Sequence, residues 1–160
     1  MMKRLGVAGL TIALLGVAAP ARADLTGFIG VNPTPSSRLV RGFAAGLALV
    51  IIGFEFEYAE TSEDEMNGAP SLRTGMGNVY LQTPFPISGL QFYGTMGGGL
   101  YRERLDMRQE TQVAGNVGGG VKIVLAGPLR LRLDYRIFNL RGDPLHSRPQ
   151  RLYAGLNLAF

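Results

Sequence analysis

The ten residues at the C-terminus, 151–160, alternate regularly between two kinds of side chain. Every second position is apolar, namely Leu152, Ala154, Leu156, Leu158 and Phe160. Because successive side chains of a strand point to opposite faces, this period of two indicates a β-strand with one apolar face. A terminal strand at the edge of a sheet exposes unpaired backbone groups, whereas a closed sheet pairs its last strand with its first. The pattern therefore predicts a barrel that residues 151–160 close.

The first 23 residues have the three parts of a secretory signal peptide. Residues 1–4 are basic at their end, residues 5–19 form an apolar run, and Ala21 and Ala23 flank Arg22 in a small-x-small cleavage pattern. We therefore expect a cleaved signal peptide over 1–23 and one mature domain over 24–160. The alternative is a retained anchor helix, which the short apolar run disfavours because a helical span needs roughly 20 residues.

The expected mature domain has a net charge close to zero. Three of the 16 Lys and Arg residues lie in the leader, which leaves 13 basic against 12 acidic residues. No nucleic-acid partner is expected from that balance. The chain has no Cys, so neither a disulfide nor a lipid-modified Cys is available. Its 23 Gly residues are too many for a helical domain and are typical of crowded, twisted strands.

Seven further segments carry the period-two pattern of the C-terminus. Together with 151–160, the predicted strands are 24–31, 42–49, 52–58, 72–83, 90–102, 112–125 and 129–137. The apolar stretch 42–56 invites a helix, but it is too short to span as one, and its alternation changes phase between Leu49 and Ile52. A two-residue turn at Val50 and Ile51 would make Leu49 and Ile52 a cross-strand pair and explains the change.

The two faces of these strands differ in size as well as in polarity. In residues 129–137, Leu, Tyr and Ile alternate with Arg and Asp, and in other strands the polar face is crowded with Gly and Ala. Small residues suit the narrow interior of an eight-stranded barrel, and bulky apolar ones suit contact with lipid. A soluble lipocalin-like barrel would have the reverse arrangement. We therefore predict an all-β fold, an eight-stranded antiparallel up-and-down transmembrane β-barrel.

The connections between the predicted strands alternate in length. Those at 50–51, 84–89 and 126–128 are short, whereas those at 32–37, 61–70, 103–110 and 141–149 are longer and polar. Short periplasmic turns and longer extracellular loops are typical of outer-membrane barrels. The alternation predicts that both ends of the mature chain lie on the periplasmic side.

With its leader, its eight Gly-rich strands, the segments 118–122 and 130–135 and the terminal Phe160, the chain resembles the small OmpA/OmpX-like outer-membrane β-barrel family. The resemblance covers the whole mature length. It implies a bacterial outer-membrane location, in contact with outer-membrane lipid and lipopolysaccharide, and it implies that Phe160 is the signal for the barrel-assembly machinery. Nothing resembling the family's optional peptidoglycan-binding domain follows Phe160, so we expect no anchoring through such a domain.

Charged residues recur on the predicted inner face. We expect a lumen charge network of Glu55, Glu57, Lys122, Arg130, Arg132, Asp134, Arg136 and Arg151. These charges must pair, because an isolated buried ion costs far more than it returns. One interpretation is a structural plug of ion pairs, since side chains fill the interior of an eight-stranded barrel. The other is a gated path for ions.

Three features of the predicted loops suggest more specific chemistry. His146 and Ser147 are the residue types that a lipid A deacylase would use as base and nucleophile. The two are adjacent in the sequence, however, and adjacent side chains of an extended segment point in opposite directions, so we do not expect them to act together. The acidic stretch from Glu60 to Glu65 offers oxygen ligands for a divalent cation that bridges lipopolysaccharide, without the spacing of an EF-hand. Arg141-Gly142-Asp143 resembles the adhesion tripeptide of integrin ligands.

The sequence favours an integral outer-membrane barrel with a structural or surface-interaction role, such as envelope integrity or adhesion through extracellular loops. We expect no catalytic residue, metal or cofactor, and the possible partner is a surface ligand held by the loops. One alternative is a narrow channel or transporter for ions or small solutes. A second is a lipid A-modifying enzyme on the same fold.

Overall fold

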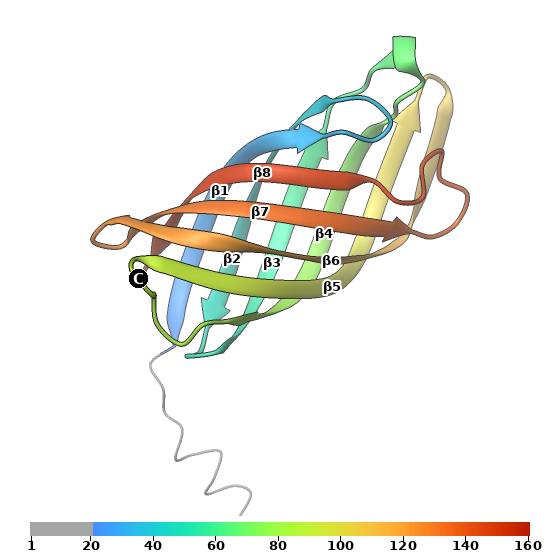
Figure 1. The fold of residues 1–160 in the computed structure, drawn as a ribbon. Helices are drawn as coiled ribbons and strands as arrows, with labels where there is room; N and C mark the ends of the chain where they lie inside the picture. Colours follow the sequence, from blue (N-terminus) through green and yellow to red (C-terminus); the bar gives the residue numbers. More distant parts are fainter. Residues whose placement is uncertain (1–20) are drawn as a thin grey trace, which may run out of the picture.

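The structure is a computed structural model that describes residues 21–160, and these form one closed barrel (Figure 1). The strands are β1 (Arg22–Asn32), β2 (Arg38–Ala48), β3 (Ile52–Thr61), β4 (Ser71–Gln82), β5 (Leu90–Leu105), β6 (Arg108–Ala126), β7 (Leu129–Leu140) and β8 (Gln150–Ala159). Each strand pairs antiparallel with the next one along the chain, and β8 pairs with β1. The predicted up-and-down barrel of eight strands is confirmed. Among residues 21–160 no helix is long and apolar enough to cross a membrane.

The seam between β1 and β8 closes the barrel. Within the expected mature domain, β1 and β8 pair antiparallel from Asp24 opposite Ala159 to Val31 opposite Leu152. The alternating residues 151–160 therefore leave no free edge at the seam. The signal peptide predicted for residues 1–23 lies outside the described residues except at its end, where Ala21 directly precedes β1 and Ala23 lies within it.

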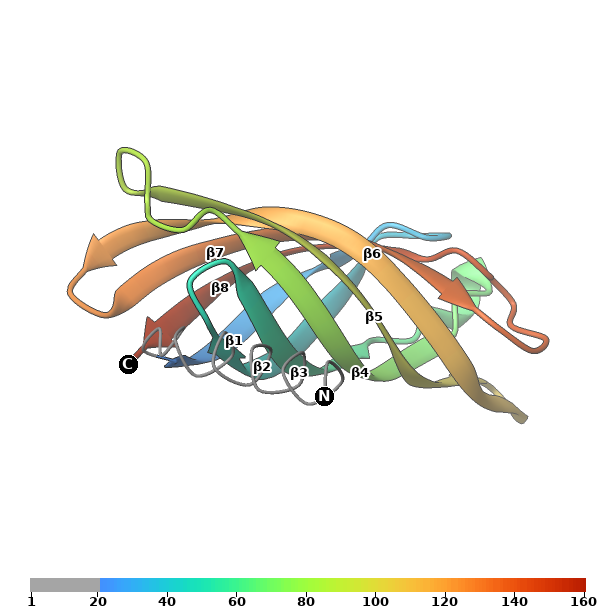
Figure 2. The same ribbon diagram turned by 90° about the horizontal axis from the view of Figure 1, so that it is seen from below.

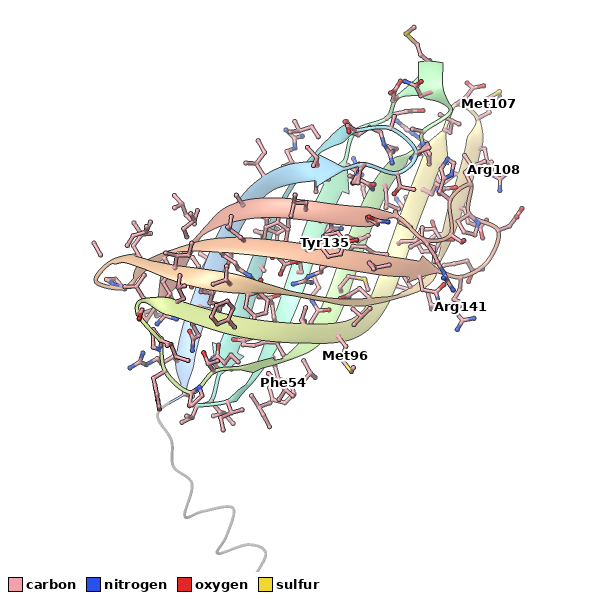
Figure 3. The ribbon with its side chains drawn as sticks, viewed as in Figure 1. Phe54, Met96, Met107, Arg108, Tyr135 and Arg141 are labelled. Atoms are coloured by element: carbon pink, nitrogen blue, oxygen red, sulfur yellow. The ribbon has the colours of Figure 1, made fainter. Side chains whose placement is uncertain are left out.

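The outer surface of the barrel is a belt of bulky apolar side chains. Phe54 and Leu156 are each 56% exposed, whereas Glu57 and Arg132 are 0% and 1% exposed. Figure 3 shows Phe54 and Met96 pointing away from the barrel wall. The predicted orientation, with large apolar groups outward and charged groups inward, is confirmed. This arrangement suits the acyl chains of a bilayer and rules out a soluble carrier with an apolar interior.

The turn between β2 and β3 has the two-residue form that the phase change predicts. The Leu49 N–H donates to the carbonyl oxygen of Ile52 at 2.7 Å, so Val50 and Ile51 occupy the turn. β2 begins earlier than predicted, at Arg38. Its first residues lie beyond the apolar belt, where the alternation that identifies a strand in the sequence is weak.

The β5–β6 connection differs most from its prediction. Residues 103–110 are predicted to form a charged loop, but β5 and β6 continue through them to a turn at Asp106 and Met107. Glu103 is paired in register with Glu110, and Asp106 has a φ of 52°, in the left-handed region that Asp tolerates. The prediction of a loop is wrong because these strand ends lie beyond the apolar belt. Apolar and polar residues stop alternating there, although the backbone pairing goes on.

The extended hairpin brings distant segments together at one end of the barrel. In Figure 1 the β5–β6 turn lies beside the β3–β4 loop, at the end of the barrel opposite the C-terminus. Figure 2 shows β5 and β6 curving together along the barrel wall. All four of the predicted extracellular connections therefore meet on one side.

Small inner residues make room for large side chains from neighbouring strands. A Cβ atom on Gly53 would lie 2.1 Å from Cζ of Tyr80. At Gly120 it would lie 2.0 Å from the carbonyl oxygen of Leu133 and 2.6 Å from the hydroxyl of Tyr93. Only glycine leaves space at these two positions, which is why the narrow interior can hold Tyr80 and Tyr93 in buried positions.

Candidate functional site

The centre of the lumen holds two carboxylates between two arginines. Arg132 of β7 forms a bidentate ion pair with Glu55 of β3, with 3.1 Å between Nη2 and Oε1, and its Nη2 lies 3.3 Å from Oδ2 of Asp134. Arg136 reaches the same two acids, with Nη2 at 3.1 Å from Oε1 of Glu55 and Nε at 2.9 Å from Oδ1 of Asp134. Each guanidinium is therefore shared between carboxylates from β3 and β7, although these strands are not neighbours.

The network continues toward the loop end of the lumen through Glu57. Its Oε2 lies 2.9 Å from Nη1 of Arg136, and its Oε1 lies 2.5 Å from Nη1 of Arg151. Arg151 also donates from Nη2 to the Thr74 hydroxyl at 2.8 Å, and its guanidinium lies 4.4 Å from the centre of the Phe138 ring. Side chains from β3, β4, β7 and β8 are thus linked across the interior.

At the opposite end, Lys122 pairs with an acid that the sequence pattern did not single out as a lumen charge. Its Nζ lies 3.0 Å from Oδ2 of Asp24, which also accepts a hydrogen bond from the Tyr80 hydroxyl at 3.3 Å. In the sequence, Asp24 stands out only as the first residue of the predicted mature domain. Its inward phase, shared with Thr26 and Phe28 in β1, is the signal that could have identified it.

Arg130 is the one predicted member that the structure leaves outside these ion pairs. It is half-buried, and its Nη1 donates to Oε1 of Gln91 at 2.8 Å. It lines a hollow of about 250 Å³ at the end where the chain termini lie, together with Gln91 and Lys122. Its position near the start of β7 places it at the mouth of the lumen, so its inward phase does not bring it to a carboxylate.

We call the eight ion-paired residues the lumen network: the separate pair Asp24 and Lys122, and the connected set Glu55, Glu57, Arg132, Asp134, Arg136 and Arg151. Each is at most 5% exposed. Four acids face four bases, so the buried charges balance, which offsets the large cost of removing each ion from water. The arrangement can cross-link the barrel wall. Among residues 21–160 no group of three or more His, Cys, Asp or Glu side chains is placed to hold a metal ion.

No protein-family model matches the chain, and no curated protein matches it. Solved structures do. The chain is similar to Neisserial surface protein A, NspA (TM-score 0.65, 17% identity, 88% of this chain and 96% of that one), and to the N-terminal β-barrel domain of Pseudomonas aeruginosa OprF (TM-score 0.65, 14% identity, 87% and 97%). It is also similar to the outer membrane enzyme PagL (TM-score 0.52, 9% identity, 84% and 98%).

The chain has the fold of the small outer-membrane β-barrels. Together with the apolar belt, this fold places the protein in the bacterial outer membrane. In such an outer-membrane barrel the longer connections are extracellular. The β3–β4 and β7–β8 connections are the longest, so we describe their end, which also carries the β1–β2 connection and the short β5–β6 turn, as extracellular and the opposite end as periplasmic.

Four contacts join the extracellular connections of this outer-membrane barrel into a closed circuit, which we call the loop ring. They are Ser36 Oγ to Asp64 Oδ2 at 2.9 Å, Asp106 N to Glu63 Oε1 at 3.1 Å, Arg108 Nη2 to Asp143 Oδ2 at 3.1 Å, and Gln150 N to Thr34 Oγ1 at 3.4 Å. Each contact joins one connection to the next around the barrel. Figure 3 shows Arg108 and Arg141 at this end of the molecule.

Two buried charges beneath the loop ring were not predicted from the sequence. Arg38 is 5% exposed and donates to the carbonyl oxygens of Thr34 and Pro70, so it ties the β1–β2 and β3–β4 loops together. Glu103 is 2% exposed and accepts a hydrogen bond from the Leu145 N–H at 2.8 Å. Both satisfy backbone groups of loops, which no period-two pattern reveals.

The acidic stretch from Glu60 to Glu65 does not converge on one point. Glu60 pairs with arginines on the outer wall, with Oε1 at 3.2 Å from Nε of Arg73. The Asp64 carboxylate accepts hydrogen bonds from the side chains of Asn67 and Ser36, which lower its pKa below the usual 3.8. These acids hold the loop and its neighbours, so the divalent-cation hypothesis gains no support from their placement.

The other two loop features lie in the β7–β8 connection. His146 is half-buried and Ser147 is exposed, and within residues 21–160 no hydrogen bond joins the His146 ring to Ser147 or to a carboxylate. In Arg141-Gly142-Asp143, the Asp143 side chain is 93% exposed yet forms the ion pair with Arg108. The adhesion hypothesis for this tripeptide stays a prediction.

Proposed function

We propose that this protein is a closed structural barrel of the outer membrane that presents its extracellular connections as one rigid surface to a macromolecular partner. The lumen network and the loop ring support the two halves of this proposal. Neisserial surface protein A, whose fold is similar, is named as a surface protein, which agrees with it.

The loop ring is the observation that carries the proposal. Loops that fold only on binding lose conformational freedom at that moment, and this loss weakens the association. Here Ser36, Asp64, Arg108 and Asp143 already join the loops in the free protein. A surface organised in this way binds a partner without that loss.

Complementation of a deletion strain tests the proposal of a rigid loop surface. A deletion strain would receive either the wild type or a Ser36→Ala/Arg108→Ala variant, which cuts the loop ring at two contacts and leaves the barrel wall intact. We expect both proteins to restore detergent resistance if the barrel supports the envelope. Adhesion of the cells to host cells should be restored by the wild type alone, and equal adhesion with both proteins would contradict a role for a rigid loop surface.

The channel alternative is disfavoured by the lumen network. An ion that passed along Glu55, Arg132 and Glu57 would have to separate buried ion pairs, which is costly in a medium of low dielectric constant. We expect no steady single-channel openings from the purified wild type in planar bilayers. Steady openings that Arg132→Ala and Glu57→Ala abolish would overturn the proposal of a closed barrel.

The enzyme alternative has one point in its favour, the similarity of the fold to the outer membrane enzyme PagL. Among residues 21–160 the His146 ring has no hydrogen bond to a Ser or to an acid, which argues against a catalytic role for it. Expression of the protein should leave the mass of lipid A unchanged. A mass change that disappears in His146→Ala would favour the enzyme instead.

A further inference from the structure

A row of arginines that outnumber their acidic partners lies on the outer wall of the barrel, facing the membrane rather than the lumen. Arg41 of β2, Glu60 of β3, Arg73 of β4 and Arg102 of β5 are successive cross-strand neighbours. All four point outward, and Arg104 lies one outward position further along β5. We call the arginines Arg41, Arg73, Arg102 and Arg104 the outer arginine row.

The single acid in this row is already occupied. Oε2 of Glu60 lies 3.6 Å from Nη2 of Arg41, its Oε1 lies 3.2 Å from Nε of Arg73, and the Tyr58 hydroxyl donates to Oε1 at 2.8 Å. In the part of the chain that the structure describes, no carboxylate lies within 4.0 Å of the Arg102 or Arg104 guanidinium. Four positive charges therefore face one negative charge, an imbalance that attracts anions.

The row surrounds a hollow of about 390 Å³, which is lined by these four arginines and by the Glu60 carboxylate, among others, so its lining keeps an excess of positive charge. Guanidinium groups that converge on one space can bind the oxygens of a phosphate with two parallel hydrogen bonds each. The hollow thus has the charge and the donors of a phosphate site.

Directly below the row, on the periplasmic side, the wall becomes apolar. The next outward positions on β2 to β5 are Phe43, Tyr58, Gly75 and Leu100, and the two apolar residues at the ends are 47% and 58% exposed. Gly75 leaves a notch between Tyr58 and Leu100, because a Cβ atom there would meet nothing within 4 Å. A second hollow of about 250 Å³ includes this notch and shares Arg73 and Arg102 with the first.

A cationic hollow above an apolar notch matches one kind of ligand. We propose that this surface binds a phosphorylated lipid of the outer leaflet, with the phosphate at Arg73 and Arg102 and an acyl chain in the notch at Gly75. In the outer leaflet, the lipid with phosphates on its sugar headgroup is the lipid A part of lipopolysaccharide. The inference rests on the outer-membrane placement and the extracellular assignment that the proposed function also uses. Contact with lipopolysaccharide is already expected from the family resemblance, and the inference adds the site on this chain that holds its phosphate and an acyl chain.

The test uses the full-length mature barrel in phosphatidylcholine vesicles. These contain lipid A with both phosphates, lipid A from which both phosphates have been removed, or no lipid A. Free inorganic phosphate in vesicles without lipid A forms a fourth arm. The readouts are the temperature at which the barrel loses its fast mobility on unheated gels, and the lipid A that remains with the purified protein by mass spectrometry.

We expect phosphorylated lipid A to raise the unfolding temperature and to remain bound, and neither dephosphorylated lipid A nor inorganic phosphate to do so. In Arg73→Gln/Arg102→Gln, both the rise in unfolding temperature and the amount of retained phosphorylated lipid A should fall, as expected from a loss of affinity of about tenfold for each arginine replaced. The matched control, Arg141→Gln/Arg148→Gln, removes the same charge from the β7–β8 loop and should bind as the wild type does. Gly75→Leu fills the notch and should weaken binding while keeping the charge.

Equal retention of phosphorylated and dephosphorylated lipid A, or equal binding by the two double variants, would overturn the proposal. Stabilisation by inorganic phosphate alone would reduce the site to an anion site and would also overturn it. A wild type that folds, does not conduct and binds no lipid A contradicts this inference but not the proposed function. A wild type that conducts ions and binds lipid A contradicts only the proposed function.

Discussion

Arg132 of β7 and Glu55 of β3 form a bidentate ion pair through the middle of the barrel, although four strand boundaries separate β3 from β7 in the sheet. The pair is a cross-link through the interior, in addition to the hydrogen bonds around the wall. Arg136 shares the same carboxylate at 3.1 Å. Glu55 is therefore the position at which one change affects two buried arginines.

Glu55→Gln should destabilise the folded barrel strongly. Removing one partner of a buried ion pair leaves an uncompensated charge and costs about 3–5 kcal/mol. Reversible urea unfolding of the refolded protein in detergent, followed by tyrosine fluorescence or by gel mobility, measures the decrease in the free energy of unfolding. Glu65→Gln is the control, because Glu65 is exposed in the β3–β4 loop. An equal effect of the two changes would show that the lumen network does not stabilise the fold.

Phe56→Arg should destabilise the protein because of its depth in the apolar belt. Phe56 is 52% exposed on the outer wall and lies midway along β3 between Ile52 and Glu60. An arginine on the lipid face costs about 2–4 kcal/mol at the midplane and about 0–1 kcal/mol near the interface. Leu39→Arg, near the extracellular start of β2, is the matched control. Phe56→Arg should therefore lower the free energy of unfolding, measured in lipid vesicles, by more than Leu39→Arg does.

Gly120→Ala should destabilise the barrel from the inside. The added Cβ atom would lie 2.0 Å from the Leu133 carbonyl oxygen, so backbone must shift, and overpacking of this kind costs about 1–3 kcal/mol. Gly27→Ala is the control, since a Cβ atom at Gly27 meets nothing within 4 Å. Equal urea midpoints for the two variants would contradict the close packing at Gly120.

The loop ring should open at low pH before the barrel unfolds. The pKa of Asp64 is lowered below 3.8 by hydrogen bonds to its charged form, so its contribution is present at neutral pH and is lost as the pH falls through that lowered value. We expect the amide protection factors of residues 62–70, which compare exchange with that of a free peptide at the same pH, to fall there, and Asp64→Asn to show fast exchange already at neutral pH. Exchange that stays slow in Asp64→Asn would contradict the role of this carboxylate.

The fold was predictable because the bilayer and the narrow lumen impose opposite demands on alternate residues. The alternation identified eight strands and the inward phase of Glu57 and Arg132, and a phase change identified the turn at Val50 and Ile51. The same reasoning failed at residues 103–110, where the strands pass beyond the apolar belt and alternation no longer reports pairing.

The partners within the lumen could not be predicted in the same way. The alternation in β7 places Arg130 and Arg136 on the same inner face. Their positions along the barrel axis differ, however, and of the two only Arg136 reaches Glu55 and Asp134. Those positions depend on the stagger of eight strands, which no single segment encodes. Asp24 was missed because its place next to the cleavage pattern hid its inward phase in β1. The contacts of the loop ring depend on loop conformations that carry no period at all.

The equal number of acids and bases in the lumen network has a consequence for the surroundings in which the protein can work. Dissolved ions weaken electrostatic attractions only where they can approach the charges, and each of these eight groups is at most 5% exposed. The ion pairs inside the barrel should therefore be equally strong in dilute freshwater and in brine. The ion pair and hydrogen bonds of the exposed loop ring should instead weaken as the salt concentration rises.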